Sequence, residues 1–373
     1  MSKRILITGG AGFVGSHLAD GLLRAGHKVR VLDNLSPQVH GGRYPDYLSR
    51  EVELQVGDVL DPACVRKALA GVDVVFHFAA RVGVGQSMYE IKRYMGVNTQ
   101  GTAGLLQAML DSKQMPGKLI VASSMSIYGE GRYRCATCKQ DAAPRVRPST
   151  QLKLAKWEML CESCGGSLDP QPTDEDKPSE INSVYALSKR DQEELCLVFG
   201  RAYGVPVTAL RFFNIYGTRQ ALSNPYTGVA AIFASRLINN QRPLIFEDGM
   251  QMRDFVSVYD VVRANLLAID HPQSDGEVIN VGCGIPITIM KVAEILTHAL
   301  GKTVEPVITQ KYRVGDIRHC YADLTKARLL LDYEPQVTHA EGFSQLAEWL
   351  AEQEAEDRAE TMLNELTAYG LTA

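Results

Sequence analysis

The stretch "ILITGGAGFVGSHLADGLLRAG" (residues 5–26) decides the fold that the sequence predicts. A short apolar run leads into Gly9, Gly12 and Gly15, and the helical pattern that follows ends at Gly26. A strand that turns directly into a helix leaves free N–H groups at the helix start, and glycines let the backbone approach an anion there. Glycine triplets also occur in ordinary turns, but this one predicts the pyrophosphate-binding turn of a dinucleotide-binding βαβ unit.

Strand-length apolar runs alternate with helical patterns through the first half of the chain. The runs "KVRVLDN", "VELQVGD", "DVVFHFAA", "GKLIVASS" and "VTALRFFN" are almost continuously apolar, as strands covered on both faces of a parallel sheet should be. The alternation predicts an α/β fold with a doubly wound parallel sheet of the Rossmann type. From about residue 215 the pattern loosens into turn-rich segments, which indicates a smaller mixed α/β lobe.

The overall composition narrows the class of protein. The chain has 373 residues, of which 45% are hydrophobic and 22% charged, and its net charge is −4. This composition is typical of a globular protein and gives no reason to expect nucleic acid or an anionic membrane as a partner. No apolar run has the length of a signal-peptide core or a membrane span. We therefore expect a cytoplasmic protein in which the eight cysteines do not form a disulfide framework.

Carboxylates and small residues at the ends of the next strands suit a dinucleotide. Asp33 ends the second predicted strand, where it can accept hydrogen bonds from both ribose hydroxyls and would repel a 2′-phosphate, so NAD is favoured over NADP. Asp58 ends the third strand and suits the adenine amine. After the fourth strand, Ala79 and Ala80 would let the backbone approach the cofactor. An ordinary strand end explains each of these residues taken alone, and only their order favours the cofactor.

A serine after a strand and a Tyr–Lys pair on a helix suggest proton transfer. Tyr185 and Lys189 in "YALSK" are four residues apart and share one helix face. Tyrosine has a pKa of about 10 and is a poor base at neutral pH, but a neighbouring ammonium group and a positively charged nicotinamide both favour the phenolate. Ser124 in "SSMSIYG" can hydrogen-bond the reacting hydroxyl. A Tyr–Lys pair is common by chance, so the prediction rests on the whole ordered set of motifs.

In this order the motifs resemble those of the extended short-chain dehydrogenases/reductases, in the nucleotide-sugar epimerase/dehydratase group. The resemblance covers residues 1–130 and 171–345. It implies a Rossmann domain that holds NAD, a C-terminal lobe that binds a nucleoside-diphosphate sugar, and a homodimer formed partly through the helix that starts at Tyr185. It divides the chain into an NAD-binding part (1–130 and 171–213) and a sugar-binding lobe (214–345), within which 255–272 packs back on the Rossmann domain. The remaining segment, 346–373, is predicted to be a solvated acidic surface helix.

The resemblance also implies individual site residues. The catalytic residues are Ser124, Tyr185 and Lys189. The cofactor contacts are Gly9, Gly12, Phe13, Val14, Gly15, Asp33, Asn34, Asp58, Val59, Phe78, Ala79, Ala80, Asn98, Tyr185, Lys189 and Phe212. The substrate contacts are Ser87, Ser126, Asn214, Arg253, Arg313, Asp316 and Cys320. The positive charge of the two arginines suits a diphosphate in any family.

The residues after the catalytic serine favour one reaction within this family. Similar 4,6-dehydratases carry Asp and Glu there, and similar decarboxylases usually keep the Glu, whereas this chain has Met125 and Ser126, which cannot shuttle a proton in the same way. Similar 3,5-epimerases need a cysteine in this loop. The sequence therefore favours a 4-epimerase that works through a transient 4-keto sugar.

The sequence agrees with more than one nucleotide-sugar substrate. The chain most resembles dTDP-6-deoxyhexose epimerases of the dTDP-L-rhamnose 4-epimerase type, and a UDP-hexose or UDP-uronate is a further possibility. The alternatives are a 4-ketosugar reductase, a dehydratase or decarboxylase, and a non-enzymatic dinucleotide sensor whose cysteine module binds a partner.

The segment 131–170 has no counterpart in the family pattern and holds two Cys-x-x-Cys pairs. Their members are Cys135, Cys138, Cys161 and Cys164. Four thiolates at this spacing suit a closed tetrahedral zinc site, and a closed site leaves no position for substrate. We therefore expect a zinc-ribbon-like insert with a structural zinc ion, while a redox dithiol or unrelated thiols are the alternatives.

Overall fold

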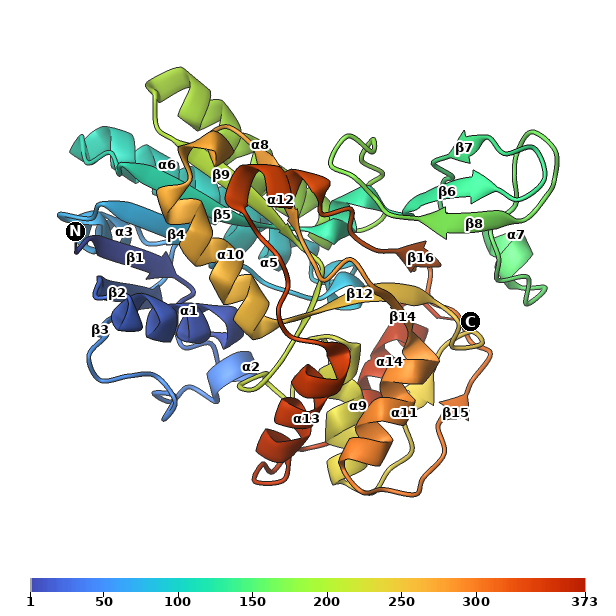
Figure 1. Ribbon diagram of the computed structural model, residues 1–373. Coiled ribbons are helices and arrows are strands. Elements are labelled where there is room, and N and C mark those ends of the chain that lie inside the picture. The colour runs from blue at the N-terminus through green and yellow to red at the C-terminus, as the bar shows by residue number, and fades with distance from the viewer. Residues whose placement is uncertain (1, 373) are drawn as a thin grey trace.

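The computed structural model describes residues 2–372 and is built around a parallel seven-stranded sheet (Figure 1). The strand order is β13-β9-β5-β4-β1-β2-β3. The strands are β1 (Arg4–Thr8), β2 (Lys28–Asp33), β3 (Glu53–Val56), β4 (Val74–His77), β5 (Lys118–Ser124), β9 (Val207–Phe212) and β13 (Val278–Val281). The predicted doubly wound α/β fold is thus confirmed. The seventh strand, β13, comes from the segment assigned to the sugar-binding lobe and pairs with β9.

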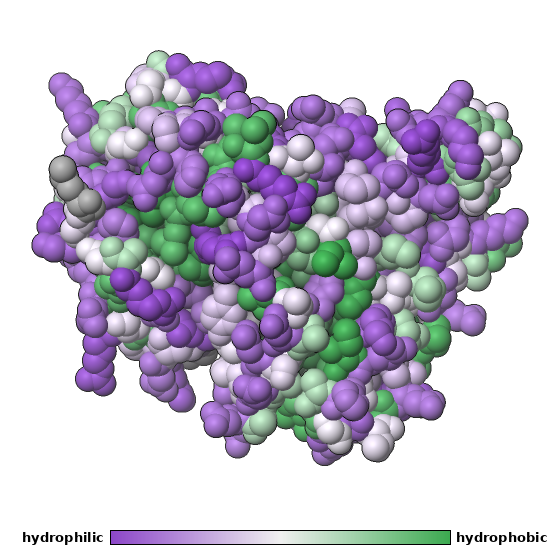
Figure 2. All heavy atoms as spheres, in the orientation of Figure 1, coloured by the Kyte–Doolittle hydropathy of each residue, from purple (hydrophilic) through white to green (hydrophobic). Residues whose placement is uncertain are grey.

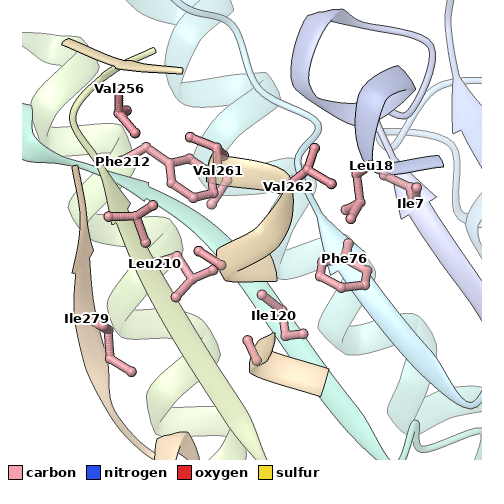
Figure 3. Close-up of a cluster of buried hydrophobic side chains, with 14 of the residues drawn as sticks. Ile7, Leu18, Phe76, Ile120, Leu210, Phe212, Val256, Val261, Val262 and Ile279 are labelled. Atoms are coloured by element: carbon pink, nitrogen blue, oxygen red, sulfur yellow. The ribbon is translucent and has the colours of Figure 1, made fainter. Parts of the chain in front are cut away.

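Helices cover both faces of this sheet, which explains why its strands are almost continuously apolar. On β1, Ile5 and Ile7 belong to one buried cluster and Leu6 to the other, because successive side chains of a strand point to opposite faces. Figure 3 shows the first cluster, with Val261 and Val262 of one covering helix against strand residues such as Ile120. The first face is covered by α1 (Phe13–Arg24), α10 (Val258–Asp270) and α12 (Thr325–Leu331). The second is covered by α3 (Pro62–Leu69), α6 (Gly101–Ser112) and α8 (Val184–Tyr203).

Helix α10, which lies within the segment 255–272, contacts α1 and supplies core residues to the first face of the sheet. Short helices in the loops of this domain are α2 (Pro37–His40), α4 (Val84–Ser87), α5 (Ile91–Tyr94), a π-helix (Met95–Gln100) and two 3₁₀ turns (Met125–Tyr128 and Pro272–Ser274).

The C-terminal lobe has its own small sheets and its own core. Its strands are β10 (Asn214–Tyr216), β11 (Leu244–Ile245), β12 (Met252–Ser257), β14 (Pro286–Thr288), β15 (Val307–Ile308) and β16 (His319–Cys320). Its helices are α9 (Val229–Ile238), α11 (Ile289–Ala299), α13 (His339–Leu350) and α14 (Ala359–Ala368). Phe233, Phe255 and Phe343 are buried in this core. The structure thereby bears out a mixed α/β lobe beside the Rossmann domain.

The cysteine insert (residues 131–170) projects beside the C-terminal lobe (Figure 1). Its strands β6 (Arg132–Cys135), β7 (Asp141–Ala142) and β8 (Leu168–Gln171) form an antiparallel sheet in the order β7-β6-β8, and α7 (Ser149–Leu152) lies between β7 and β8 in the chain. Tyr133, Met159 and Leu168 pack with Cys135, Cys138 and Cys161 in a small core. The insert is therefore a folded unit.

Hydrophilic side chains cover most of the face drawn in Figure 2. No helix within residues 2–372 is both long and apolar enough to cross a membrane.

The close approach of the glycine turn to β4 gives a test of the fold. A Cβ atom on Gly9 (φ +70°) would lie 2.8 Å from the backbone nitrogen of Ala79, whereas Gly26 (φ +81°) has open space at that position. Gly26→Ala should cost only the strain of a left-handed alanine, about 1–2 kcal/mol. Gly9→Ala adds a backbone clash and should destabilise the protein by at least twice as much in urea unfolding. Equal losses in the two variants would contradict this contact.

Candidate active site

A cavity of about 620 Å³ lies at the edge where the parallel strands end, between the Rossmann domain and the C-terminal lobe. Residues from both parts line it, including Asp33 and Tyr185 from the first and Arg253 from the second. Ligands of open α/β sheets bind at this edge because the loops that follow successive strands converge there.

The predicted glycine turn forms one wall of the cavity. Helix α1 starts after Gly12 without a side-chain cap, so its first N–H groups can receive an anion. A Cβ on Gly15 would lie 2.6 Å from the carbonyl oxygen of Gly9. The turn therefore needs glycine at positions 9 and 15. Phe13 and Val14 line the cavity beside it.

The carboxylates expected to face a ribose and an adenine line the same part of the cavity. The carboxylate of Asp33 accepts the N–H groups of Ala11 at 3.0 Å and Leu35 at 2.9 Å, which fixes its direction. The amide of Asn34 donates to Asp58 at 2.9 Å. Val59 lines the cavity next to this pair. These contacts fit the polar groups of an adenosine.

Aromatic and small residues line the middle of the cavity. Phe78 and Phe212 meet edge to face with ring centroids 5.9 Å apart. Ala79 and Ala80 follow Phe78, and the N–H of Ala79 donates to the hydroxyl of Thr8 at 3.2 Å. The small side chains keep the backbone accessible to a flat ligand.

Ser124, Tyr185 and Lys189, the three residues expected to be catalytic, all line the cavity. Ser124 ends β5, and Tyr185 lies in the first turn of α8, whose start is capped by Ser183. Burial raises the pKa of Tyr185 to about 12, and the neighbouring Ser124 side chain acts in the opposite direction. Burial lowers the pKa of Lys189 to about 8.

A buried polar network that the motifs did not reveal holds Lys189. Its Nζ donates to the carbonyl of Ala122 at 2.6 Å and to Oε1 of Gln192 at 2.9 Å. Gln192 in turn donates to the hydroxyl of Thr102 at 3.0 Å, and His77 contacts the same hydroxyl at 2.8 Å. Burial lowers the pKa of His77 to about 3, so this ring is neutral. The only sequence signal was that Gln192 follows Lys189 by three residues on one helix face.

Asn98 and Ser87, which were predicted to contact the cofactor and the substrate, do not line the cavity. Both lie buried behind residues that do. Asn98, in the π-helix, is fully buried and donates to the carbonyl of Arg81 at 3.0 Å and to Ser188 at 2.9 Å. Ser87 is also fully buried, and its hydroxyl accepts the N–H of Tyr185 at 3.0 Å. Both residues position other parts of the site.

Two arginines and a carboxylate form the opposite end of the cavity. Arg253 Nη2 lies 3.3 Å from Asp316 Oδ1, and Arg313 Nη2 lies 2.7 Å from Asp316 Oδ2. Burial would raise the pKa of Asp316, but the guanidinium groups of Arg313 and Arg253 hold it below its ordinary value. The charged carboxylate therefore keeps both arginines at the cavity.

The other predicted substrate contacts divide into two kinds. Ser126 and Asn214 line the cavity, and Ser126 Oγ and Asn214 Oδ1 are buried with no hydrogen-bond partner among residues 2–372. Such atoms are available to a polar ligand. Cys320 does not line the cavity, contrary to the expectation, because β16 pairs with β12 and buries its thiol near Thr173.

Helix α14 corrects the prediction of a solvated terminal helix. Ala359, Met362 and Leu366 are buried, and these three residues line the cavity together with Leu363 and Leu371. They recur at helical spacing on one face, a signal that the acidic composition of the segment concealed. The segment 346–373 also contains the end of α13, so it is not one helix.

The burial of α14 can be tested with two leucines. Leu366 is 2% exposed and packs over Gly85, while Leu329 is 79% exposed. Leu366→Ala should lower the free energy of unfolding by about 2–4 kcal/mol. Leu329→Ala should change it by less than about 0.5 kcal/mol. Chemical unfolding of both variants measures this, and a Leu366 variant as stable as the parent would refute a docked helix.

The four cysteines of the insert come together, away from the cavity lining. Their Sγ atoms all lie within 4.8 Å of one another, with Cys138 and Cys161 at 3.8 Å. Tetrahedral zinc with Zn–S bonds of about 2.3 Å requires S···S separations of about 3.8 Å. The N–H of Cys138 points at the Cys135 sulfur at 3.3 Å and lowers the pKa of that thiol. The cluster can thus hold a metal ion with four thiolates.

Fold and cavity together define a dinucleotide-binding enzyme of the short-chain dehydrogenase/reductase class. The chain belongs to the NAD dependent epimerase/dehydratase family, whose sequence model matches residues 5–282.

Similar proteins act on nucleotide sugars in several ways. A dTDP-L-rhamnose 4-epimerase from Burkholderia thailandensis is 33% identical over 358 residues, which cover 94% of this chain and 96% of the relative. A UDP-N-acetyl-alpha-D-glucosaminuronate decarboxylase from Bacillus cytotoxicus is 32% identical over 361 residues, covering 94% and 99%. The structure of UDP-glucuronic acid 4-epimerase from Bacillus cereus, in complex with UDP-glucuronic acid and NAD, matches with a TM-score of 0.75 and 26% identity, covering 93% and 99%.

Proposed function

We propose that this protein binds NAD and epimerises a nucleoside-diphosphate sugar at C4. One observation carries the choice of reaction: among the described residues that line the cavity, the only carboxylates are Asp33, Asp58 and Asp316. Asp33 and Asp58 lie near the glycine turn, and Asp316 lies between two arginines. The wall at Ser124 and Tyr185 therefore has no carboxyl group to drive elimination of water or loss of CO₂.

The cavity fits NAD at the Rossmann end. The glycine turn provides N–H groups for a pyrophosphate, and Asp33 provides a fixed acceptor for ribose hydroxyls. The buried Asp33 carboxylate would also repel a 2′-phosphate, which supports NAD over NADP. When bound, the nicotinamide supplies the acceptor and donor of hydride at C4.

The protein's own residues supply the proton transfer. Tyr185 accepts the proton of the sugar 4-hydroxyl and returns it after the 4-keto sugar has turned over, while Ser124 hydrogen-bonds the same oxygen. Because burial raises the pKa of Tyr185, its phenolate needs positive charge nearby. Lys189 provides that charge one helical turn away, fixed by Ala122 and Gln192.

Arg253, Arg313 and Asn214 are proposed to hold the diphosphate of the substrate. The guanidinium groups suit phosphate oxygens, and the open Asn214 side chain adds a polar contact. The apolar side chains of α14 beside Gly85 suit a 6-deoxy sugar, which agrees with the 33% identical dTDP-L-rhamnose 4-epimerase. We therefore propose a dTDP-6-deoxyhexose as the first substrate to try and a UDP-hexose or UDP-uronate next.

The reaction can be tested by NMR of dTDP-L-rhamnose, UDP-glucose and UDP-glucuronate incubated with the enzyme. We expect inversion at C4 of one of them without added cofactor. Tyr185→Phe should lower kcat by at least about 10²-fold, because it removes the proton acceptor. Tyr203→Phe, an exposed position at the end of the same helix, should leave kcat unchanged. Reduction of a 4-keto sugar by added NADH, with no inversion of any substrate, would instead identify a reductase.

The cysteine cluster is proposed to hold one structural zinc ion. The thiolate set leaves no open coordination position, and its sulfurs are absent from the cavity lining. The ion would fix the two Cys-x-x-Cys turns relative to each other. It would thereby stabilise the sheet of the insert, which has only a small apolar core.

Metal analysis tests this assignment. We expect about one zinc per chain, and Cys161→Ser should lose it because three thiolates bind zinc more weakly than four. Cys64→Ser is the control, since Cys64 lies outside the cluster and contacts Asp61. A metal-free protein with four reduced cysteines would refute the site.

We also propose that the chain forms a homodimer, partly through α8. Leu187, Val198 and Tyr203 on α8 are apolar or aromatic and exposed, and a second copy would cover them.

A further inference from the structure

The cysteine insert reaches the wall of the cavity through a buried charge network. Arg147 belongs to the insert, its side chain is fully buried, and it forms two parallel hydrogen bonds to Glu247 of the C-terminal lobe at 2.8 and 2.9 Å. A further nitrogen contact joins Arg147 to the backbone oxygen of Asp316 at 3.3 Å. These two parallel hydrogen bonds fix the guanidinium group relative to the carboxylate, since Arg presents its donors in one plane.

A second residue of the insert, Glu158, contacts Arg318 and His319, close in the chain to Asp316. Glu158 accepts from Arg318 Nε at 3.0 Å and lies 3.2 Å from the ring of His319. The fully buried Arg318 also donates to Glu247 at 3.0 Å and to Asp248 at 2.7 Å. Two residues of the insert, Arg147 and Glu158, therefore both contact residues 316–319.

Residues at or next to the two ends of the insert add backbone contacts to this segment. The N–H of Gly131 donates to the carbonyl of His319 at 2.9 Å, and the N–H of Thr173 donates to the carbonyl of Tyr321 at 2.8 Å. Glu130, just before the insert, accepts the N–H groups of Arg318 at 2.7 Å and His319 at 3.2 Å. The chain thus contacts this segment both where it enters the insert and just after it leaves it.

The segment so held directs the guanidinium group of Arg253. Arg253 donates to the carbonyl of Ile317 at 2.6 Å and to that of Arg318 at 2.9 Å, in addition to its contact with Asp316. Arg313 pairs with Asp316 and stacks over Phe246 at 4.9 Å. Phe246 directly precedes Glu247, which has a left-handed backbone (φ 54°) that a non-glycine residue adopts only when its surroundings hold it.

We propose that the cysteine insert, folded around its metal, positions Arg253 and Arg313 for the diphosphate of the substrate. This rests on the proposed function. Arg147 and Glu158 are positioning residues, because they contact Glu247 and residues 316–319, which hold the two arginines, and do not themselves line the cavity. The insert governs affinity for the nucleotide part of the substrate, and the proton transfer at Ser124 and Tyr185 proceeds independently of it.

The first test measures, for each variant, the Kd for dTDP and for UDP. It also measures whether the substitution changes KM or kcat for the nucleotide sugar. Arg147→Lys keeps the positive charge but loses the two parallel hydrogen bonds to Glu247. Glu158→Gln keeps the shape of a half-exposed side chain but removes its negative charge. Each should raise KM for the nucleotide sugar and Kd for the free nucleotide by about tenfold, with kcat and the Kd for NAD changed less than twofold. Arg147→Met should raise them further. Arg145→Met is the matched control, since Arg145 is exposed and lies two residues away.

The second test uses the metal itself on the unaltered chain. Removing zinc with a chelator should raise the Kd for dTDP or UDP by about tenfold and leave NAD binding unchanged. Because coupling between two sites is reciprocal, saturating nucleotide should tighten zinc binding by the same factor. NAD binding and circular dichroism report whether the Rossmann domain of each sample stays folded. If the Arg147 variants fail to fold, Glu158→Gln alone tests the inference.

The outcomes separate the inference from the proposed function. A parent protein that binds dTDP or UDP, with unchanged affinity after loss of zinc and in Glu158→Gln, overturns the inference alone. A loss of kcat with KM unchanged also overturns it, because the insert would then act on the chemistry. A parent protein that binds neither nucleotide overturns both the inference and the proposed function.

Discussion

The shared direction of the seven strands is the constraint on which the site depends. Because β1, β2, β4, β5 and β9 run parallel, their carboxyl ends meet at one edge, and the residues that follow them converge there. The close contact between the glycine turn after β1 and the backbone after β4 leaves no room for a side chain at Gly9. That tight approach shapes the Rossmann end of the cavity, and the C-terminal lobe closes the other end.

Burial makes the charge states of Tyr185 and Lys189 depend on their neighbours. Desolvation raises the pKa of Tyr185 and lowers that of Lys189, so each group disfavours its charged form when alone. The network of Gln192, Thr102 and His77 offsets this by giving the ammonium group fixed acceptors and keeping neutral groups around it. Helix α8 therefore carries both Lys189 and Gln192, one of the acceptors that hold its ammonium group.

The C-terminal half does more than close the cavity. It provides β13 and α10 to the Rossmann domain and α14 to the cavity wall, so the two parts cannot be separated cleanly in sequence. The buried pairing of Arg147 with Glu247 links the insert to this half in a similar way. Removing one member of such a pair leaves an unpaired buried charge, which is costly. The insert is thus joined to the C-terminal lobe through a buried ion pair.

The sequence by itself determined the parallel sheet, the glycine turn, Asp33, the Ser–Tyr–Lys set and the four-cysteine cluster. Each of these depends on local spacing: apolar runs, a turn between strand and helix, one helix turn between Tyr185 and Lys189, and two residues between paired cysteines. Only the tertiary structure decided that Ser87 and Asn98 stand behind the wall, that Cys320 is buried away from the cavity, and that α14 lines it. These outcomes, and the link from Arg147 to the arginines at the cavity, depend on contacts between segments far apart in the chain, which no local pattern encodes.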